Sequence, residues 1–449
     1  MKRKVKFVSV ILLAAGVFFM FISCASKPGV THAEMDAGVQ EGAFDEVLVQ
    51  LDTERSRPAR GRDRSTAYST RNEVLFYLDR GMIAHYAGLY QESFENLERA
   101  EQLIEEAFTR SVSQDIASLI VNDNMRDYSG ESYEDLYVNV FNALNRYHLN
   151  DLQGAVVEVR RLNEKLSLLA DRHQRAVERV KESNDKLDTT NIEASRFSNS
   201  ALARYLGILF YRAIGNRDGV RIEHEELEQA FRLAPEIYAN PIPSSVREEL
   251  SVPPDMARLN VIAFTGLSPL KEEENVVIPL PFPPPQHEAR IALPVLVSRP
   301  QTITRVEVVL STGEKFDLQL LEDIGAVAKE TFKSSYALTV LRSTARAIAR
   351  TTAVAASAAA AGRRGGEAAG LATRILGRVL SEAAENADTR ISRYFPNYAL
   401  VGGINLEPGT YMMTINFYGA RGLMESHRRE VSVQSNVLNL EQFINISET

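Results

Sequence analysis

Residues 201–219 read ALARYLGILFYRAIGNRDG, and this stretch best indicates how the first half of the chain folds. An apolar segment leads through Gly207 and Tyr211 to a polar turn at Gly215, and Ala230 and Pro235 close the unit. Small residues are needed where two paired helices cross, because their backbones approach closely only where side chains are short. The stretch therefore predicts two antiparallel helices joined by a short turn.

Similar units occur upstream, and together they fall at the spacings of the tetratricopeptide pattern, which has a period of about 34 residues. One unit carries Gly81, Tyr90, Ser93, Leu97 and Ala100, and a weaker one spans 137–162 with Ala143, Ala155 and Val159. We therefore predict a tetratricopeptide-like helical repeat domain at 34–235. An ordinary helical bundle is the alternative. The long polar helix pattern at 162–199 includes Arg172 and Arg175, which we interpret as a solvated face.

After Pro253 and Pro254 the pattern changes from helical spacing to alternation. Strands are predicted at 259–264, 289–297, 304–310, 315–320, 398–406, 410–418 and 430–433. The fold class is therefore α+β: helical repeats, a linker at 236–258, and a smaller β-sandwich-like domain at 259–449. That domain has a helical insertion at 321–386, which begins with an amphipathic helix at 321–350. Its Ala- and Gly-rich part, 350–386, is interpreted as a packed helical hairpin, with a membrane-active segment as the alternative.

The N-terminus has the pattern of a bacterial lipoprotein signal. Basic residues at 2–6 precede an uncharged apolar run at 7–22, and the only cysteine of the chain, Cys24, follows Ser23. The alternative is an uncleaved anchor, but a membrane-spanning helix needs about 20 apolar residues. We expect a signal peptide at 1–23, a lipidated Cys24 and a tether at 24–33. Phe21 stands where the lipobox usually has leucine.

Removal of 1–23 leaves 47 basic and 59 acidic residues, a formal net charge of −12. Nucleic acid is a poor partner for such a chain. Because Ala25, and not aspartate, follows the cysteine, resemblance to Gram-negative lipoproteins implies the outer membrane, and we favour its periplasmic face. Once Cys24 is lipidated, no thiol remains for a disulfide, a zinc–thiolate site or a cysteine nucleophile.

No catalytic motif is recognisable in the sequence. The closest approach to a metal site is a run that resembles the calcium-binding loop of an EF-hand, with Asn216, Asp218, Gly219 and Glu225 at positions of that loop. Ile214 falls at its first position, where the motif requires an oxygen ligand. We therefore expect no catalytic residues, no metal and no cofactor.

Several stretches resemble a family of uncharacterised bacterial lipoproteins with tetratricopeptide-like repeats. They are 88–93, 138–144, 201–219, 321–324, 346–350, 387–390 and 406–411. The family carries no agreed reaction, so the resemblance implies a location and an architecture. The tryptophan that often follows the Ala-Asp-Thr-Arg stretch is absent, and Tyr394 is the candidate to replace it.

The leading hypothesis is a non-enzymatic, lipid-anchored scaffold that binds a protein partner of the cell envelope through a groove formed by the repeats. First helices of tetratricopeptide repeats line the inner face, so the candidate groove residues are Tyr77, His85, Asn142, Tyr205 and Ile208. The alternative is an envelope hydrolase acting on cell-wall glycan or peptide. That alternative requires two facing carboxylates with raised pKa values.

Overall fold

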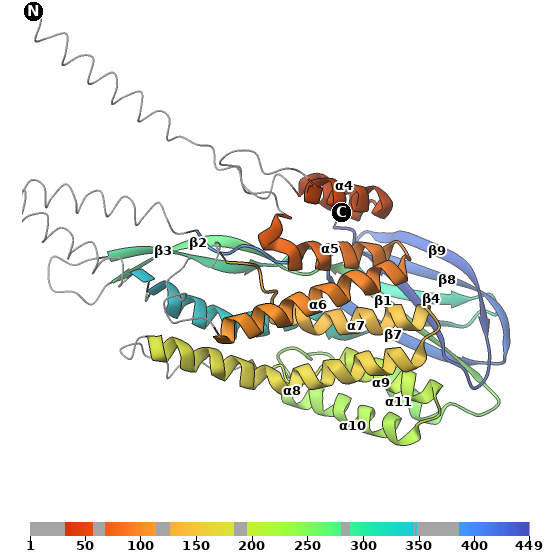
Figure 1. The fold of residues 1–449 in the computed structure, drawn as a ribbon. Coiled ribbons are helices and arrows are strands. Elements are labelled where there is room, and N and C mark those ends of the chain that lie inside the picture. The colour runs from red at the N-terminus through yellow and green to blue at the C-terminus, as the bar shows by residue number, and fades with distance from the viewer. Residues whose placement is uncertain are drawn as a thin grey trace, which may run out of the picture.

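The computed structural model describes residues 32–56, 68–113, 126–183, 195–279, 288–344, 346–347 and 386–448. Within these ranges helices occupy the first half of the chain and strands most of the second (Figure 1). The α+β fold class is therefore confirmed at this coarse level. The signal peptide, Cys24, most of the tether and nearly all of the Ala- and Gly-rich stretch lie outside the described residues.

The helical part consists mainly of antiparallel pairs that lie side by side (Figure 1). In the pairs α5/α6, α7/α8 and α9/α10 the first helix is almost fully buried, whereas the second has an exposed polar face. The helices are α3 (Ala33–Gln40), α4 (Phe44–Ser56), α5 (Glu73–Tyr86), α6 (Tyr90–Ser113), α7 (Ser132–His148), α8 (Leu152–Ser183), α9 (Ala201–Ala213), α10 (Arg217–Leu233) and α11 (Ser244–Glu248), with the short 3₁₀ turns η1 (Thr70–Asn72) and η4 (Glu249–Ser251).

The turns within the pairs α5/α6, α7/α8 and α9/α10 have the same backbone geometry. In each, an amide hydrogen bond of 2.8–2.9 Å closes the end of the first helix, as from Leu89 to Ala84 and from Asp151 to Arg146. The residue before that donor has a positive φ, which is 75° at Gly88, 61° at Asn150 and 73° at Gly215. This is the Schellman type of helix end, which needs a left-handed residue after the helix.

Close helix crossing explains the glycine in the first helix of the α5/α6 pair. A Cβ added at Gly81 would lie 2.7 Å from Leu97 Cγ and 3.3 Å from the Leu97 backbone nitrogen. The two backbones pass too closely for a side chain. The predicted role of Gly81 as a small residue at a helix crossing is thus confirmed.

The strands form two four-stranded sheets and a two-stranded hairpin. The first sheet has the order β10-β1-β7-β6, and β10 runs parallel to β1. The second sheet has the order β5-β4-β8-β9. Strands β2 and β3 form the hairpin. The strands are β1 (Ala257–Leu267), β2 (Leu270–Pro279), β3 (Glu288–Val297), β4 (Ile303–Leu310), β5 (Lys315–Asp317), β6 (Gln319–Asp323), β7 (Pro396–Leu406), β8 (Gly409–Gly419), β9 (Gly422–Val433) and β10 (Asn439–Asn445).

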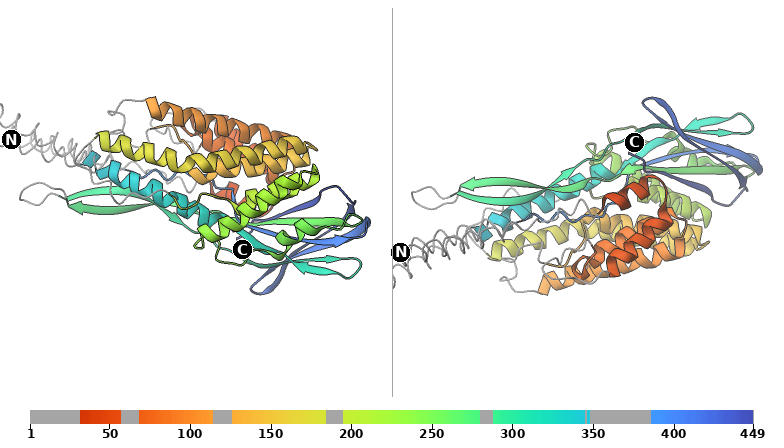
Figure 2. Two further views of the ribbon diagram at one scale, coloured as in Figure 1. Left: turned by 90° about the horizontal axis from the view of Figure 1, so that it is seen from below. Right: turned by 90° about the horizontal axis from the view of Figure 1, so that it is seen from above.

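Every residue of β1 is buried, because the first sheet lies between two other layers. Ile262 and Phe264 pack into a core shared with the helices, whereas Leu259 and Val261 pack into a core shared with the second sheet. The order of layers is therefore helices, first sheet, second sheet. The two views in Figure 2 show the helices on one side of the strands and the β2–β3 hairpin beside the helix at 324–344.

Some sequence predictions need correction. The strands β2 and β10 were not predicted, since Glu272–Glu274 interrupt the alternation in β2 and polar residues dilute the apolar ones in β10. The amphipathic helix begins at residue 324 and not at the predicted residue 321, because residues 321–323 are the last three residues of strand β6. The 236–258 stretch also contains α11 and η4.

Candidate functional site

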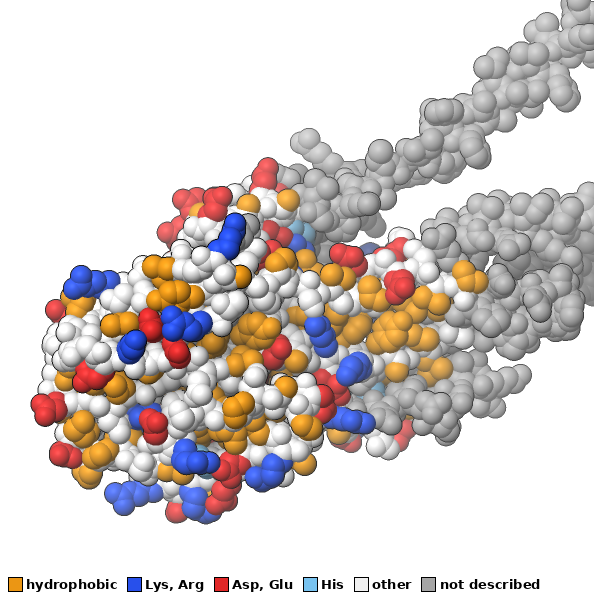
Figure 3. All heavy atoms as spheres, turned by 180° about the vertical axis from the view of Figure 1, so that it is seen from behind, with side chains coloured by type: hydrophobic (Ala, Val, Ile, Leu, Met, Phe, Trp, Pro, Cys, Tyr) orange, Lys and Arg blue, Asp and Glu red, His pale blue; other side chains and the backbone are white. Residues whose placement is uncertain are grey.

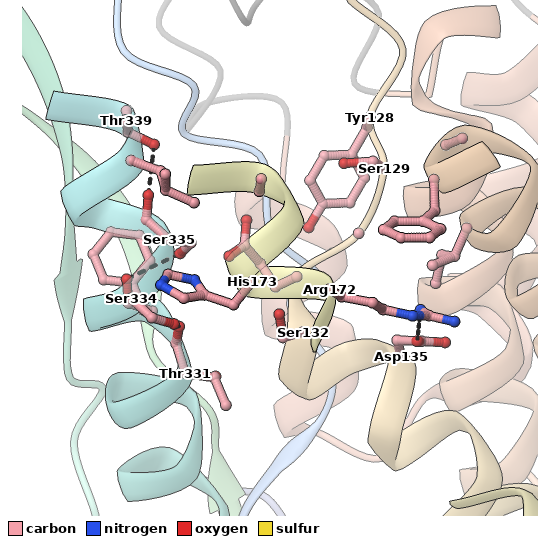
Figure 4. A pocket seen from close by; sticks show the side chains of 18 of the residues that line it. Tyr128, Ser129, Ser132, Asp135, Arg172, His173, Thr331, Ser334, Ser335 and Thr339 are labelled. Atoms are coloured by element: carbon pink, nitrogen blue, oxygen red, sulfur yellow. Dashed lines mark hydrogen bonds and ion pairs between the residues drawn. The ribbon is translucent and has the colours of Figure 1, made fainter. Parts of the chain in front are cut away.

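A cavity of about 420 Å³ lies between the C-terminal halves of α6 and α8 on one side and the helix at 324–344 on the other. The N-terminal end of α7 forms its floor, and Lys271 of β2 and Asp388 also line it. In Figure 4 side chains from α8 and from the helix at 324–344 point toward one another across this space. The elements that form the cavity are far apart in sequence.

The floor of the cavity is fixed by the start of α7. Glu131 is the N-cap residue, and Glu134 completes a capping box by accepting a 2.7 Å hydrogen bond from the Glu131 amide. A capping box satisfies amide groups that the first helical turn leaves unpaired. Ser132, in this turn, therefore faces the cavity from a rigid position.

One wall carries cations that are tied to carboxylates. Lys165 lies 2.6 Å from Asp135 and 2.8 Å from Glu101, and Arg172 lies 2.8 Å from Glu105 and 3.5 Å from Asp135. The side chain of Arg172 is 23% exposed and paired with carboxylates, so it is not part of a fully solvated face, whereas Arg175 of the same helix is 59% exposed, as predicted. These ion pairs hold α8 against α6 and α7.

Asp388, which lines the cavity, is held as a carboxylate. Burial alone would raise its pKa, but hydrogen bonds from Arg390, 2.7 and 2.8 Å long, and the charge of that guanidinium lower the pKa below its ordinary value. Arg390 also donates to Asn72 and to the Arg126 carbonyl, each over 3.0 Å. The segment before β7 is thereby fastened to the helical layer.

The opposite wall presents hydroxyl groups. Thr331, Ser335 and Thr339 follow one another at intervals of four residues along the helix at 324–344, and Ser334 lies beside them (Figure 4). Each hydroxyl donates its proton to a backbone carbonyl three or four residues earlier in the helix. Their oxygen atoms remain able to accept hydrogen bonds from a ligand.

His173 of α8 points toward this hydroxyl wall in Figure 4. Its Nε2 atom is buried and has no hydrogen-bond partner among the described residues. Burial lowers the pKa of His173, which favours the neutral imidazole. The cavity therefore offers one unsatisfied imidazole nitrogen, several hydroxyl oxygens and paired charges, a set typical of a binding surface.

Behind the cavity lies a network of buried carboxyl groups. Burial raises the pKa of Glu134 to about 8 and that of Asp79 to about 6. The Ser392 amide donates to Glu134 and the Ser392 hydroxyl donates to Asp79, while Tyr68 donates to Asp79 over 2.8 Å. Neither carboxyl group lines the cavity. They fasten the segment before β7 to α5 and α7.

A third buried carboxyl group, Glu322 of β6, connects the first sheet to the helices. It accepts hydrogen bonds from the hydroxyls of Tyr137, Tyr238 and Ser200 and from the amide of Leu202. Ser200 is the N-cap of α9, so Glu322 lies at the start of that helix. Burial raises the pKa of Glu322.

The five candidate groove residues do not line an open groove, and this is a correction. His85, Asn142, Tyr205 and Ile208 are each at most 1% exposed, and Tyr77 is half-buried. The first sheet covers the helix face on which they lie: Asn260 of β1 donates to the Tyr205 hydroxyl, and Gln442 of β10 bonds to His85. The chain's own strands thus occupy the surface that we expected a partner to use.

Most residues that form the cavity, such as Lys165, His173, Thr331 and Ser335, were not predicted from the sequence, and Arg172 was predicted only as part of a solvated face. The hydroxyls at 331, 335 and 339 were the one available signal, because their spacing places them on one helix face. Which element faces them depends on contacts across long stretches of chain.

Among the described residues, no group of three or more His, Cys, Asp or Glu is placed to hold a metal ion. Within the same described ranges no helix has the length and apolar character needed to cross a membrane. Comparison with family models, with curated proteins and with solved structures found no match for this chain.

Proposed function

We propose that this protein is a non-enzymatic scaffold of the cell envelope that binds a protein partner and is anchored by acyl chains on Cys24. The signal pattern at 1–24 supports the anchor. Stable anchoring takes two lipid signals, and lipoprotein processing supplies more than one chain. The outer membrane, with the protein on its periplasmic face, is part of this proposal.

The arrangement of elements supports the finer interpretation of the fold. Three antiparallel helix pairs with matching turns, α5/α6, α7/α8 and α9/α10, support tetratricopeptide-like repeats. Two four-stranded sheets that share an apolar core support a β-sandwich-like second part.

The observation that carries the proposal is the position of the carboxyl groups with raised pKa values. Three such groups, Asp79, Glu134 and Glu322, accept hydrogen bonds inside the fold, and none of them lines the 420 Å³ cavity. The carboxylates that do line it include Asp135, which is paired with Lys165, and Asp388, which is paired with Arg390. A glycan hydrolase needs two carboxyl groups that face its substrate. The cavity instead offers hydroxyls, paired charges and His173, which favours recognition of a partner.

The partner surface differs from our sequence-based prediction. With the inner helix face covered by the first sheet, the partner would contact the cavity between α6, α8 and the helix at 324–344. On the face in Figure 3, basic and acidic side chains are interspersed with apolar ones. This mixture, together with the net negative charge, favours a protein partner over nucleic acid.

Site-specific photocrosslinking in intact envelopes tests the proposal. A photoreactive amino acid replaces Ser335 at the cavity, and in a matched control it replaces Arg232 on α10, whose side chain is 65% exposed. We expect Ser335 to give a discrete crosslinked protein that Arg232 does not give. The same crosslinked bands from both positions would contradict the cavity as the partner site. Turnover of peptidoglycan fragments by the purified protein would favour the hydrolase instead.

A further inference from the structure

A second open cavity, of about 480 Å³, lies at the other end of α6 from the first. It is formed where the turns of the helix pairs meet β9 and β10, and Tyr90, at the start of α6, lines it. Its size is within the range of small-ligand sites, about 300–1,000 Å³.

Two residues with unusual backbone geometry meet at this cavity. Asn150 (φ 61°) and Asn436 (φ 62°) are the non-glycine residues with positive φ in the described parts of the chain, and both line it. Glycine adopts the left-handed conformation without steric cost, whereas a residue with a side chain, asparagine included, adopts it less readily. Such costs concentrate at functional sites.

The equivalent helix turns make the choice of asparagine informative. Gly88 and Gly215 occupy the position that Asn150 occupies, with matching backbone hydrogen bonds. The side-chain amides of Asn150 and Asn436 make no hydrogen bond to a described residue, and both residues are exposed. Both amides are therefore available to a ligand.

The other polar groups of the cavity are balanced in charge. Arg429 lies 3.1 Å from Glu441, and the Tyr90 hydroxyl makes no hydrogen bond to any described residue. Leu152 and Leu438 supply apolar surface beside them. Neutral amides, a phenol and one ion pair suit a ligand that is uncharged and rich in hydroxyl groups.

The edge of β10 is closed to an added peptide strand at this place. The Tyr147 hydroxyl accepts from the Leu440 amide over 3.1 Å and lies 3.3 Å from the Leu440 carbonyl, and Arg429 donates to the Gln442 carbonyl over 2.9 Å. Strand addition needs these backbone groups to be free. This argues against an extended peptide as the ligand.

A hydrogen-bond chain holds one wall of the cavity in place. His148 Nε2 donates to Gln442 over 3.1 Å, the Gln442 side-chain nitrogen donates to His85 Nε2, and His85 Nδ1 donates to Asn145 over 2.6 Å. His148 also stacks on Tyr90, with ring centroids 4.0 Å apart. Fixed side chains reduce the entropy lost on binding.

We propose that this second cavity binds a neutral, hydroxyl-rich glycan through the side-chain amides of Asn150 and Asn436, the Tyr90 hydroxyl and the Arg429–Glu441 pair. This inference is independent of the partner proposed for the first cavity.

The test uses the full-length lipidated protein in detergent, with two neutral tetrasaccharides, chitotetraose and maltotetraose, as probes. Saturation-transfer NMR and titration calorimetry measure binding to the wild type and to the double variant Asn150→Gly/Asn436→Gly. Glycine tolerates positive φ, so the variant should fold at least as stably. We expect at least one tetrasaccharide to bind, and its affinity to fall about tenfold or more in the variant, as expected for two lost hydrogen bonds.

A matched control places asparagine at a left-handed turn outside the cavity. Gly313 has φ 97° and no atom within 4 Å of an added Cβ, so Gly313→Asn should leave glycan affinity unchanged. The proposal is overturned if neither tetrasaccharide binds at millimolar concentration, or if the double variant binds as tightly as the wild type. Capture of a peptide with no glycan binding would also overturn it.

Discussion

Tyr137 of α7 donates a 2.5 Å hydrogen bond to Glu322 of β6, although 185 positions separate the two residues in the chain. Tyr238 and Ser200 donate to the same carboxyl group. One buried acid therefore connects the helical layer, the start of α9 and the first sheet. Because this acid satisfies several buried hydroxyls at once, the way the layers fit together depends on it.

Replacing Glu322 tests that dependence. Glu322→Ala should lower the free energy of unfolding by roughly 3 kcal/mol or more, because it leaves several buried hydroxyls without an acceptor. Glu322→Gln keeps one acceptor oxygen and should cost less. Chemical denaturation measures both, with Glu225→Ala as the control, since Glu225 is 61% exposed on α10. Equal stability of Glu322→Ala and the wild type would rule out this role.

Stability should fall as the pH rises from 6.5 to 8. Burial raises the pKa of Glu134 from 4.5 to about 8, so the folded protein holds this proton more tightly than the unfolded chain, and stability declines with rising pH between these values. His85 has the opposite effect, because burial lowers its pKa from 6.5 to about 4, but that effect ends near pH 6.5. Between pH 6.5 and 8 the loss from Glu134 should reach on the order of 1–2 kcal/mol.

Denaturation curves at pH 6.5 and pH 8 measure this loss, and Glu134→Gln is the matched variant. It keeps the shape of the side chain but cannot ionise, so its stability should change less over the same interval. If the wild type and the variant lose the same stability over this interval, the ionisation of Glu134 is not the cause of the loss.

The helix crossings should not tolerate larger side chains. At Gly81 an added Cβ already lies 2.7 Å from Leu97, and Ala230 is 1% exposed. Gly81→Leu or Ala230→Leu should therefore destabilise the protein by roughly 1–3 kcal/mol or more. Thermal melts measure the effect against Gln91→Leu on the exposed face of α6, which should change little. Unchanged melts for both core variants would argue against close helix pairing.

The lipid anchor is tested at Cys24. Cys24→Ala removes the thiol to which the diacylglyceryl group would be attached, so processing at this position should stop and the precursor should keep its larger size. Detergent-phase partition and gel mobility, compared with the wild type, measure the result. A mature-sized protein that still partitions into detergent would show that the anchor is not on Cys24.

Local patterns in the sequence were enough to predict much of the secondary structure. The helical spacing within 34–235 and Gly81 at a crossing depend on residues a few positions apart, and the described part of that range has helices and a close crossing. Most strands were predicted for the same reason. The uninterrupted burial of β1 agrees with the apolar run Val261–Phe264, but it also includes Arg258 and Asn260, which bond to the buried Glu249.

Tertiary structure alone decided what covers each apolar face. His85 and Tyr205 were placed on the inner helix face, but only the position of β1 and β10 shows that the chain's own sheet covers them. The first cavity likewise depends on His173 meeting the helix at 324–344, well over 100 residues later. A helix presents the same apolar stripe to any neighbour, so local spacing specifies which face is buried but not which segment packs against it. The segment that covers this face is decided by the packing of parts of the chain that are distant in sequence, because that packing minimises the exposed apolar surface of the whole chain.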